Sequence, residues 1–249
     1  MGKKDIERTT RKKQNNRDGV DSRSGSRGAA GKGGRGVRAE LVFILDASGS
    51  MAGLESDTIG GFNALIEENR EKSGEASVSL VQFNDRSKVV LDRVPIEKVP
   101  RLTRSTYRCR GCTALLDAVG AAIEHIDLVQ RVQPAGYEAD RVLFVITTDG
   151  MENASRRFGY RRVRHLIRKH REMGWEFLFI GANIDVEHEA ESLGLDPDMA
   201  VEYIADDIGT GALYEAASIA TATVRAGASM TSGAWRAGID EDRRRRGRS

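Results

Sequence analysis

The chain has 249 residues and a formal net charge of +2, which suits one α/β domain with short tails. A folded body of about 200 residues buries roughly 70% of its unfolded surface, so neither a disulfide nor a structural metal is needed for stability. The sequence has no run of 18 apolar residues and no apolar segment behind its first residues. We therefore expect no membrane-spanning helix, no secretory signal and a cytoplasmic location.

Positive charge is concentrated at the two ends of the chain. Residues 1–38 contain 12 Lys and Arg against 4 Asp and Glu, and residues 240–249 contain 5 against 3. The intervening residues 39–239 contain 22 basic and 30 acidic groups, a net charge of −8. An acidic body with basic ends bears on solubility and partners rather than on the fold.

The composition divides the chain into a tail, a domain and a second tail. Residues 1–38 are rich in Gly, Arg, Ser, Lys and Asn and cannot bury enough apolar area to offset the entropy of ordering. We predict that they form a disordered basic tail and that order begins at Ala39. The domain is expected over residues 39–235. Residues 236–249 are interpreted as a basic C-terminal tail whose last ten residues are frayed.

The sequence predicts six strands. Three apolar runs are typical of strands buried on both faces: ELVFILDAS (40–48), DRVLFVITTDG (140–150) and WEFLFIGAN (175–183). Between the first two, ASVSLVQFND (76–85) alternates apolar and polar residues. Its Asn84-Asp85 turn allows SKVVLDRV (87–94) to return as an antiparallel edge strand. A short strand is expected at AVEYIA (200–205).

Helical spacing of apolar residues separates these strands. The predicted helices cover residues 54–72, 113–130, 159–173, 187–195 and 209–227. Strands that alternate with helices favour a parallel sheet with helices on both faces. We therefore predict a single α/β domain, a Rossmann-like three-layer sandwich around a mostly parallel six-strand sheet with one antiparallel edge strand.

Polar oxygens gather where two central strands end. Asp46, Ser48 and Ser50 lie two residues apart, so in extended backbone their side chains share one side above the carboxyl edge of the sheet, where open α/β sheets bind ligands. Asp149 follows the other strand to the same edge, and Thr113 can reach it from a loop. Hydroxyl and carboxylate oxygens suit Mg²⁺ or Mn²⁺, and a cation between Asp46 and Asp149 would relieve their repulsion.

Three motifs resemble a known family. DASGSM (46–51), GCTALLDAV (111–119) and ITTDGMEN (146–153) are similar to the metal-ion-dependent adhesion site of the von Willebrand factor A domain, over roughly residues 39–230. The resemblance is greatest to the compact stand-alone bacterial members. It implies that Asp46, Ser48, Ser50, Thr113 and Asp149 hold Mg²⁺ or Mn²⁺. It also implies that a carboxylate from a protein partner completes the metal shell.

Several other residues leave alternatives open. Glu152 and Asn153 either line the rim of the site or cap the next element, and Asn183 and Asp185 either contact the rim or form a turn. Cys109 and Cys112 are interpreted as ordinary thiols, a redox pair beside Thr113, or part of a shared metal site. The four histidines have no recognised zinc spacing.

The basic segment RRFGYRRVRHLIRKHR (156–171) has its own alternatives. It is a solvated helix face above a core stripe of Val163, Leu166 and Ile167, or it contacts phosphate.

The expected function is metal-dependent protein binding without catalysis. An Asp that ends the first strand is also found in phosphatases of the haloacid dehalogenase type, but these need a second carboxylate two residues on, where this chain has Ser48. The sequence has no GxSxG elbow and no GxxxxGK[ST] loop. A Mg²⁺-dependent hydrolase is thus the least favoured alternative. Weak, salt-sensitive nucleic-acid binding through the basic tails is the other.

Overall fold

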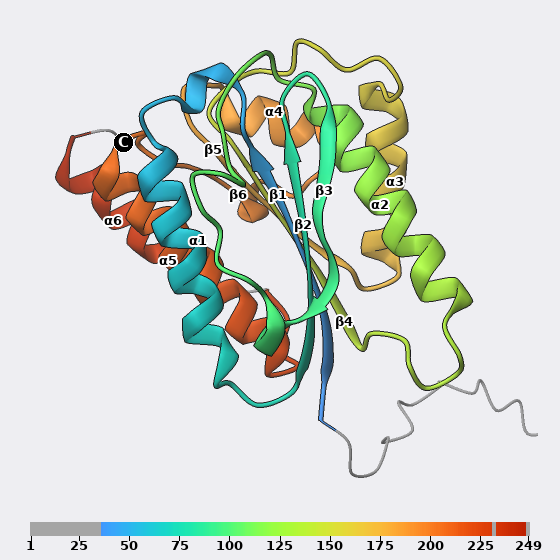
Figure 1. The fold of residues 1–249 in the computed structure, drawn as a ribbon. Coiled ribbons are helices and arrows are strands. Elements are labelled where there is room, and N and C mark those ends of the chain that lie inside the picture. Colours follow the sequence, from blue (N-terminus) through green and yellow to red (C-terminus); the bar gives the residue numbers. More distant parts are fainter. Residues whose placement is uncertain (1–35, 231–232, 248–249) are drawn as a thin grey trace, which may run out of the picture. The chain divides into compact units, whose positions relative to one another are not determined.

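The computed structural model describes residues 36–230 and 233–247, where six strands form one sheet in the order β3-β2-β1-β4-β5-β6 (Figure 1). All neighbouring strands pair in parallel except β2 and β3, which are antiparallel at the edge. The predicted sheet is thereby confirmed. The strands are β1 (Arg38–Asp46), β2 (Glu75–Phe83), β3 (Ser87–Pro95), β4 (Arg141–Thr148), β5 (Glu176–Gly181) and β6 (Ala200–Glu202).

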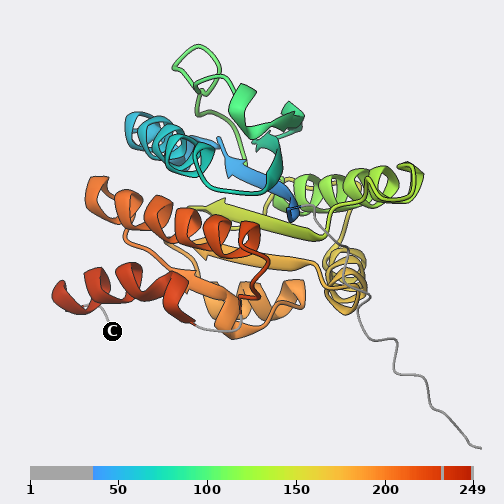
Figure 2. The same ribbon diagram turned by 90° about the horizontal axis from the view of Figure 1, so that it is seen from below.

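Helices cover both faces of the sheet, as the alternating pattern predicts (Figure 2). One face packs against α1 (Glu55–Arg70), α5 (Asp207–Arg225) and α6 (Ala237–Arg245). The other packs against α2 (Leu115–Val132), α3 (Tyr160–Glu172) and α4 (Val186–Leu193). Short 3-10 turns lie at Gly49–Met51, Ile96–Lys98, Pro197–Met199 and Gly233–Arg236. Within the described residues, no helix is both long and apolar enough to cross a membrane.

Strand β1 is apolar without interruption because both of its faces are buried. Phe43 and Leu45 pack into the core beneath α1 and α5, whereas Val42 and Ile44 pack into the core beneath α2 and α3. Each successive side chain thus meets a helix layer, on alternate faces. Strands β1 and β4 are adjacent, with Leu45 paired to Thr147, so both strands end at the same level of the carboxyl edge.

The prediction of a frayed C-terminus is wrong for most of residues 240–249, which continue the helix α6 from Ala237 to Arg245. Ile239 is buried in the core beside α5, and Arg243 forms an ion pair of 2.6 Å with Glu202 at the end of β6. The four consecutive arginines hide this helix in the sequence, because their charge masks its few apolar anchors. At the other end, β1 begins at Arg38 rather than Ala39, and residues 1–35 of the predicted tail lie outside the described residues.

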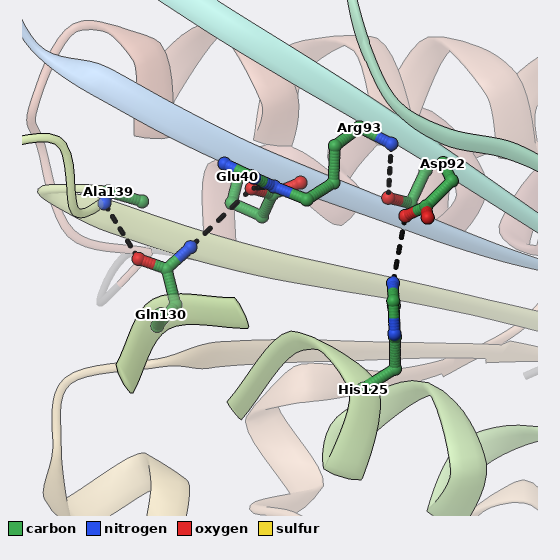
Figure 3. Close-up of polar contacts among 7 residues, drawn as sticks. Glu40, Asp92, Arg93, His125, Gln130 and Ala139 are labelled. Carbon is green, nitrogen blue, oxygen red and sulfur yellow. Dashed lines mark hydrogen bonds and ion pairs between the residues drawn. The ribbon is translucent and has the colours of Figure 1, made fainter. Parts of the chain in front are cut away.

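A buried glutamate sits at the opposite end of β1 from the polar edge (Figure 3). Glu40 is 1% exposed, and its Oε2 accepts hydrogen bonds from Arg93 Nε at 2.8 Å and Gln130 Nε2 at 3.5 Å. Beside it, Asp92 Oδ1 lies 2.8 Å from His125 Nε2 of α2. Burial raises the pKa of Glu40 to about 7, although the hydrogen bond and positive charge of Arg93 act to lower it.

A β-bulge in the edge strand delivers this arginine. The pairing of β2 with β3 shifts register between Val78 and Leu80, where Asp92 and Arg93 together oppose Ser79. Arg93 has a φ of 52°, in the left-handed region, and its amide donates to Ser79 Oγ at 3.0 Å. Bulges re-aim side chains and carry local strain. Here the bulge turns Arg93 across β2 toward Glu40 on β1.

The buried carboxyl group of Glu40 makes the free energy of unfolding depend on pH. Glu40 ionises near pH 4.5 when unfolded and near 7 when folded, so the folded state keeps the proton longer. The stability that the neutral form contributes is complete below pH 4.5 and is lost as the pH rises through 7. Wild type should lose about 3 kcal/mol relative to Glu40→Gln over this range. Urea unfolding of both at pH 5 and pH 8 measures it.

The exposed Glu187 of α4 provides the control, because Glu187→Gln also removes one carboxylate but from a solvated position. The difference between wild type and Glu187→Gln should stay small at both pH values. A difference between wild type and Glu40→Gln that does not change with pH would contradict the assignment of the buried proton to Glu40.

Candidate metal centre

The first part of the polar cluster is built where β1 turns into the 3-10 segment Gly49–Met51. The amide of Ser48 donates to Asp46 Oδ1 at 2.7 Å, and Ser48 Oγ lies 2.9 Å from Ser50 Oγ. The amide of Gly49 donates to Gly111 O at 3.0 Å, which ties this turn to the loop before α2. The turn therefore holds three side-chain oxygens on one side of the strand end, as the spacing predicts.

Asp149 and Thr113 converge on the same point from two other loops. Ser50 Oγ donates to Asp149 Oδ1 at 2.5 Å, directly after the end of β4. A Cβ atom placed on Gly150 would lie 3.2 Å from Ser50 Oγ and 3.3 Å from Thr113 Oγ1. Both hydroxyls thus border the small space that the glycine leaves open. The structure brings all five predicted residues together at one edge of the sheet.

The spacing and chemistry of these oxygens fit a small divalent cation. Neighbouring ligands of an octahedral ion bound at about 2.0–2.1 Å lie about 2.9 Å apart. Ser48 Oγ and Ser50 Oγ have this separation. Two carboxylates and three hydroxyls form a set of hard oxygen donors suited to Mg²⁺ or Mn²⁺. The described residues contain no cluster of three or more His, Cys, Asp and Glu, so the donor set differs from that of a zinc site built from such residues.

The electrostatics of the cluster favour a cation. Asp46 is 1% exposed and Asp149 is 4% exposed. Burial raises the pKa of Asp46, and burial followed by the charge of Asp46 raises the pKa of Asp149. Only hydroxyls and amides donate to Asp46, including Thr148 Oγ1 at 2.6 Å from its Oδ2. In the part of the chain that the structure describes, neither carboxylate has a basic side chain as a partner.

Two residues that position Asp46 escaped the sequence analysis. Thr148 holds Oδ2 of Asp46 and so turns Oδ1 toward Ser48 and the cluster. Tyr107, from the long loop before α2, donates from its hydroxyl to the backbone oxygen of Asp46 at 2.5 Å. A signal for Thr148 existed, namely a hydroxyl at the end of an apolar strand beside Asp149. Tyr107 lies in a loop without periodicity, so no local pattern indicates it.

Glu152, Asn153, Asn183 and Asp185, the residues considered for the rim of the site, have structural contacts in the fold. Glu152 accepts the amide of Leu116 at 2.9 Å, at the start of α2. Asn153 Oδ1 accepts the amide of Thr113 at 2.9 Å, and Asn153 N donates to Thr113 O at 3.0 Å. These two residues fix the loop that presents Thr113. Farther away, Asp185 caps α4, and Asn183 adopts a left-handed turn conformation with φ 58°.

The two cysteines form no disulfide, and the pKa of each thiol is raised. Both are free, Cys109 half-buried and Cys112 exposed. Burial raises the pKa of Cys109 to about 11, and a hydrogen bond with Asp85 raises the pKa of Cys112. Reactive cysteines need a lowered pKa, so these shifts disfavour the redox alternative.

From Tyr160 onward the basic segment forms α3, with Val163 and Ile167 buried, Leu166 partly buried and most of its arginines exposed, which matches the solvated-face interpretation.

Comparison with known protein families shows which family the chain belongs to. The family model of the von Willebrand factor type A domain matches residues 40–216. The chain belongs to this family. The matched range contains all five residues of the cluster and strands β2 to β6, and it begins within β1. No curated protein sequence matches the chain at a significant level.

Solved structures of this fold are similar over most of this VWA chain. Proximal thread matrix protein 1 from the mussel byssus has a TM-score of 0.53 at 17% identity and covers 75% of this chain. A von Willebrand factor type A protein from Catenulispora acidiphila has a TM-score of 0.50 at 17% identity over 77%. The pilus adhesin SpaC from Lactobacillus rhamnosus GG has a TM-score of 0.53 at 14% identity and covers 78% of this chain.

These likenesses support the fold alone, because the identities are low. The chain spans only 47%, 43% and 30% of the lengths of the three proteins, respectively. Their further domains and activities therefore do not transfer to this VWA chain.

Metal should stabilise the folded VWA domain through the five-residue cluster. Binding to the native state alone stabilises it by about 2.7 kcal/mol when the metal exceeds its Kd about a hundredfold. Asp46→Ala should abolish this increment and raise the metal-free Tm, since it removes one of two repelling buried carboxylates. Ser48→Ala should weaken metal binding without raising the metal-free Tm. Calorimetry with Mg²⁺ and Mn²⁺ measures both, and equal metal-induced shifts in wild type and Asp46→Ala would place the ion elsewhere.

Thr148 should tune the metal affinity through Asp46. Thr148→Val keeps the shape of the side chain but removes the donor to Asp46 Oδ2. Loss of such an outer hydrogen bond should weaken metal binding about 10- to 100-fold. Thr147→Val is the matched control, because its hydroxyl is also buried in β4 but contacts only Ile44 O at 3.5 Å. Titration calorimetry that gives equal metal affinities for the two variants would remove Thr148 from the site.

Proposed function

We propose that this chain is a metal-dependent protein-binding module. Mg²⁺ or Mn²⁺, held by Asp46, Ser48, Ser50, Thr113 and Asp149, would receive a carboxylate oxygen from a protein partner. The observation that carries the proposal is the convergence of two buried carboxylates and three hydroxyls with no basic partner among the described residues. Such a cluster is electrostatically incomplete without a cation.

The position of the cluster supports a bridging role. Gly49 and Ser50 are exposed, so a ligand can approach the ion from solvent above the sheet edge. If each of the five residues supplied one oxygen, a six-coordinate ion would keep one position for a partner oxygen. One solved structure of the mussel byssus protein has zinc in its MIDAS motif, at a TM-score of 0.52 and 18% identity. This supports a divalent ion at the equivalent edge, whereas the preference for Mg²⁺ or Mn²⁺ rests on the donor set.

The surroundings of the cluster give little support to hydrolysis. A hydrolase needs a general base within hydrogen-bond reach of the reacting water. Glu152 is the nearest further carboxylate in sequence, but its Oε1 accepts the amides of Ala154 and Ser155, and its Oε2 accepts the amide of Leu116. It is therefore committed to holding the loop. The proposal accordingly assigns binding and no catalytic residue.

Partner capture should require the metal. Purified wild type on beads should retain a partner in Mg²⁺ and release it in EDTA, because the ion bridges the two proteins. Asp46→Ala should retain none in either buffer. Thr147→Val, which leaves the five oxygens unchanged, should behave as wild type. Mass spectrometry of the eluates identifies the partner, and retention that is equal in EDTA and Mg²⁺ would exclude a metal bridge.

A further inference from the structure

Two cavities flank the metal cluster on the same edge of the VWA sheet. The larger, about 890 Å³, reaches Thr113 through its neighbours Cys112 and Asn153. The smaller, about 380 Å³, reaches the β1 end through Ala47 and Arg110, whose amide donates to Ala47 O at 2.9 Å. Both cavities include Arg86, from the turn between β2 and β3. The two cavities thus adjoin each other at Arg86, and their linings include sequence neighbours of the cluster residues.

Cationic side chains dominate this surface. The two cavities are lined by six of them, all exposed: Arg86, Lys88, Arg108, Arg110, Arg156 and Arg157. Within residues 36–230 and 233–247, none of the six takes part in an ion pair with an acidic side chain. Some arginines elsewhere on the domain pair with carboxylates, as Arg162 does with Glu124 at 2.6 Å, whereas others, such as Arg168, have no ion pair within the described residues. The guanidinium groups around the metal cluster are therefore available to an outside anion.

The two acidic residues in the cavities, Asp85 and Asp117, offset only part of the six positive charges, and their carboxylates also hold backbone amides. Asp117 accepts the amides of Arg156 at 3.0 Å and of Arg157 and Phe158 at 2.8 Å. Asp85 Oδ1 accepts the amide of Cys112 at 3.0 Å. These bonds fix the loops that carry the arginines, so the cationic groups are presented from ordered backbone. Ordered presentation lowers the entropy lost on binding an anion.

The charge of this surface is opposite to that of the domain as a whole. Residues 39–239 carry a net charge of −8, yet the cavities beside the metal cluster hold six cationic and two acidic side chains. An acidic segment would be steered to this one surface and repelled from the rest of the body. Arginine binds carboxylates through two parallel hydrogen bonds, which suits the planar groups of Asp and Glu.

We propose that the partner segment of this VWA domain is a run of acidic residues. One carboxylate reaches the metal, and flanking carboxylates enter the two cavities beside Arg86, Arg156 and Arg157. This inference rests on the proposed function, and it adds that the arginines determine which carboxylate-bearing partner binds. Nucleic acid fits less well, since among the described residues no aromatic side chain lines the larger cavity to stack a base.

Fluorescence anisotropy of labelled peptides tests this with the whole chain. The probes are an oligoglutamate peptide, a Gly/Ser peptide of equal length with a single Glu, and an oligo-dT strand, each in Mg²⁺ and in EDTA. The variants are Arg86→Ser, the triple variant Arg86→Ser/Arg156→Ser/Arg157→Ser, and the control Arg168→Ser. Arg168 is an exposed arginine of α3 that lines neither cavity and has no ion pair within the described residues.

Oligoglutamate should bind more tightly than the single-Glu peptide in Mg²⁺ and lose affinity in EDTA. The affinity for oligoglutamate should fall on the order of tenfold in the triple variant and a few-fold in Arg86→Ser, because exposed charge pairs are individually weak. The single-Glu peptide should change little in these variants. Arg168→Ser should match wild type, and calorimetric metal affinity should be the same in all four proteins.

The other outcomes separate the two proposals. Metal-dependent oligoglutamate binding that is equal in the triple variant and in Arg168→Ser overturns the acidic-segment inference and leaves the metal bridge intact. Oligoglutamate binding that is equal in EDTA overturns the inference as well, since no carboxylate then uses the ion. Tighter binding of oligo-dT than of oligoglutamate assigns the surface to nucleic acid instead. Absence of calorimetric metal binding in wild type overturns the proposed function itself.

Discussion

The burial of two carboxylates at the ends of neighbouring central strands is the constraint on which this structure depends. Parallel pairing of β1 with β4 brings Asp46 and Asp149 to one level, and both residues are buried. Two such charges repel, and burial adds a desolvation cost to each. Everything around them reduces that cost: the hydroxyls of Ser50 and Thr148 donate to them, and the protein leaves one side open for a cation.

Much of the fold could be predicted because the apolar pattern of each strand indicates which of its faces are buried. The runs at 40–48, 140–150 and 175–183 are apolar on both faces, and only a sheet covered by two helix layers buries both. The C-terminal helix could not be predicted in this way. Its stability comes from tertiary partners, the core around Ile239 and the ion pair of Arg243 with Glu202, and no window of the sequence contains these.

The same distinction applies to the cluster at the sheet edge. Its five oxygens follow strand ends and a helix start, so spacing and topology together predict that they meet. Tyr107 and Thr148 act on Asp46 from a different loop and a different strand, and the structure shows which atoms of Asp46 they contact. The arginine-lined cavities belong to this second kind. Arg86 and Arg156 lie 70 residues apart in sequence, and only the packed loops bring them to one surface.

Strand β1 itself shows why the carboxyl edge is the functional one. Glu40 and Asp46 lie on the same strand, an even number of residues apart, and both are 1% exposed. The fold answers the charge of Glu40 from within, by bending the edge strand until Arg93 reaches it at 2.8 Å. Among the described residues, Asp46 receives only hydroxyl and amide donors, while Arg108 and Arg110 line the smaller cavity. At Glu40 the domain places its own basic side chain beside a carboxyl group whose pKa is raised to about 7, whereas at the opposite end of the same strand Asp46 has no basic partner among the described residues.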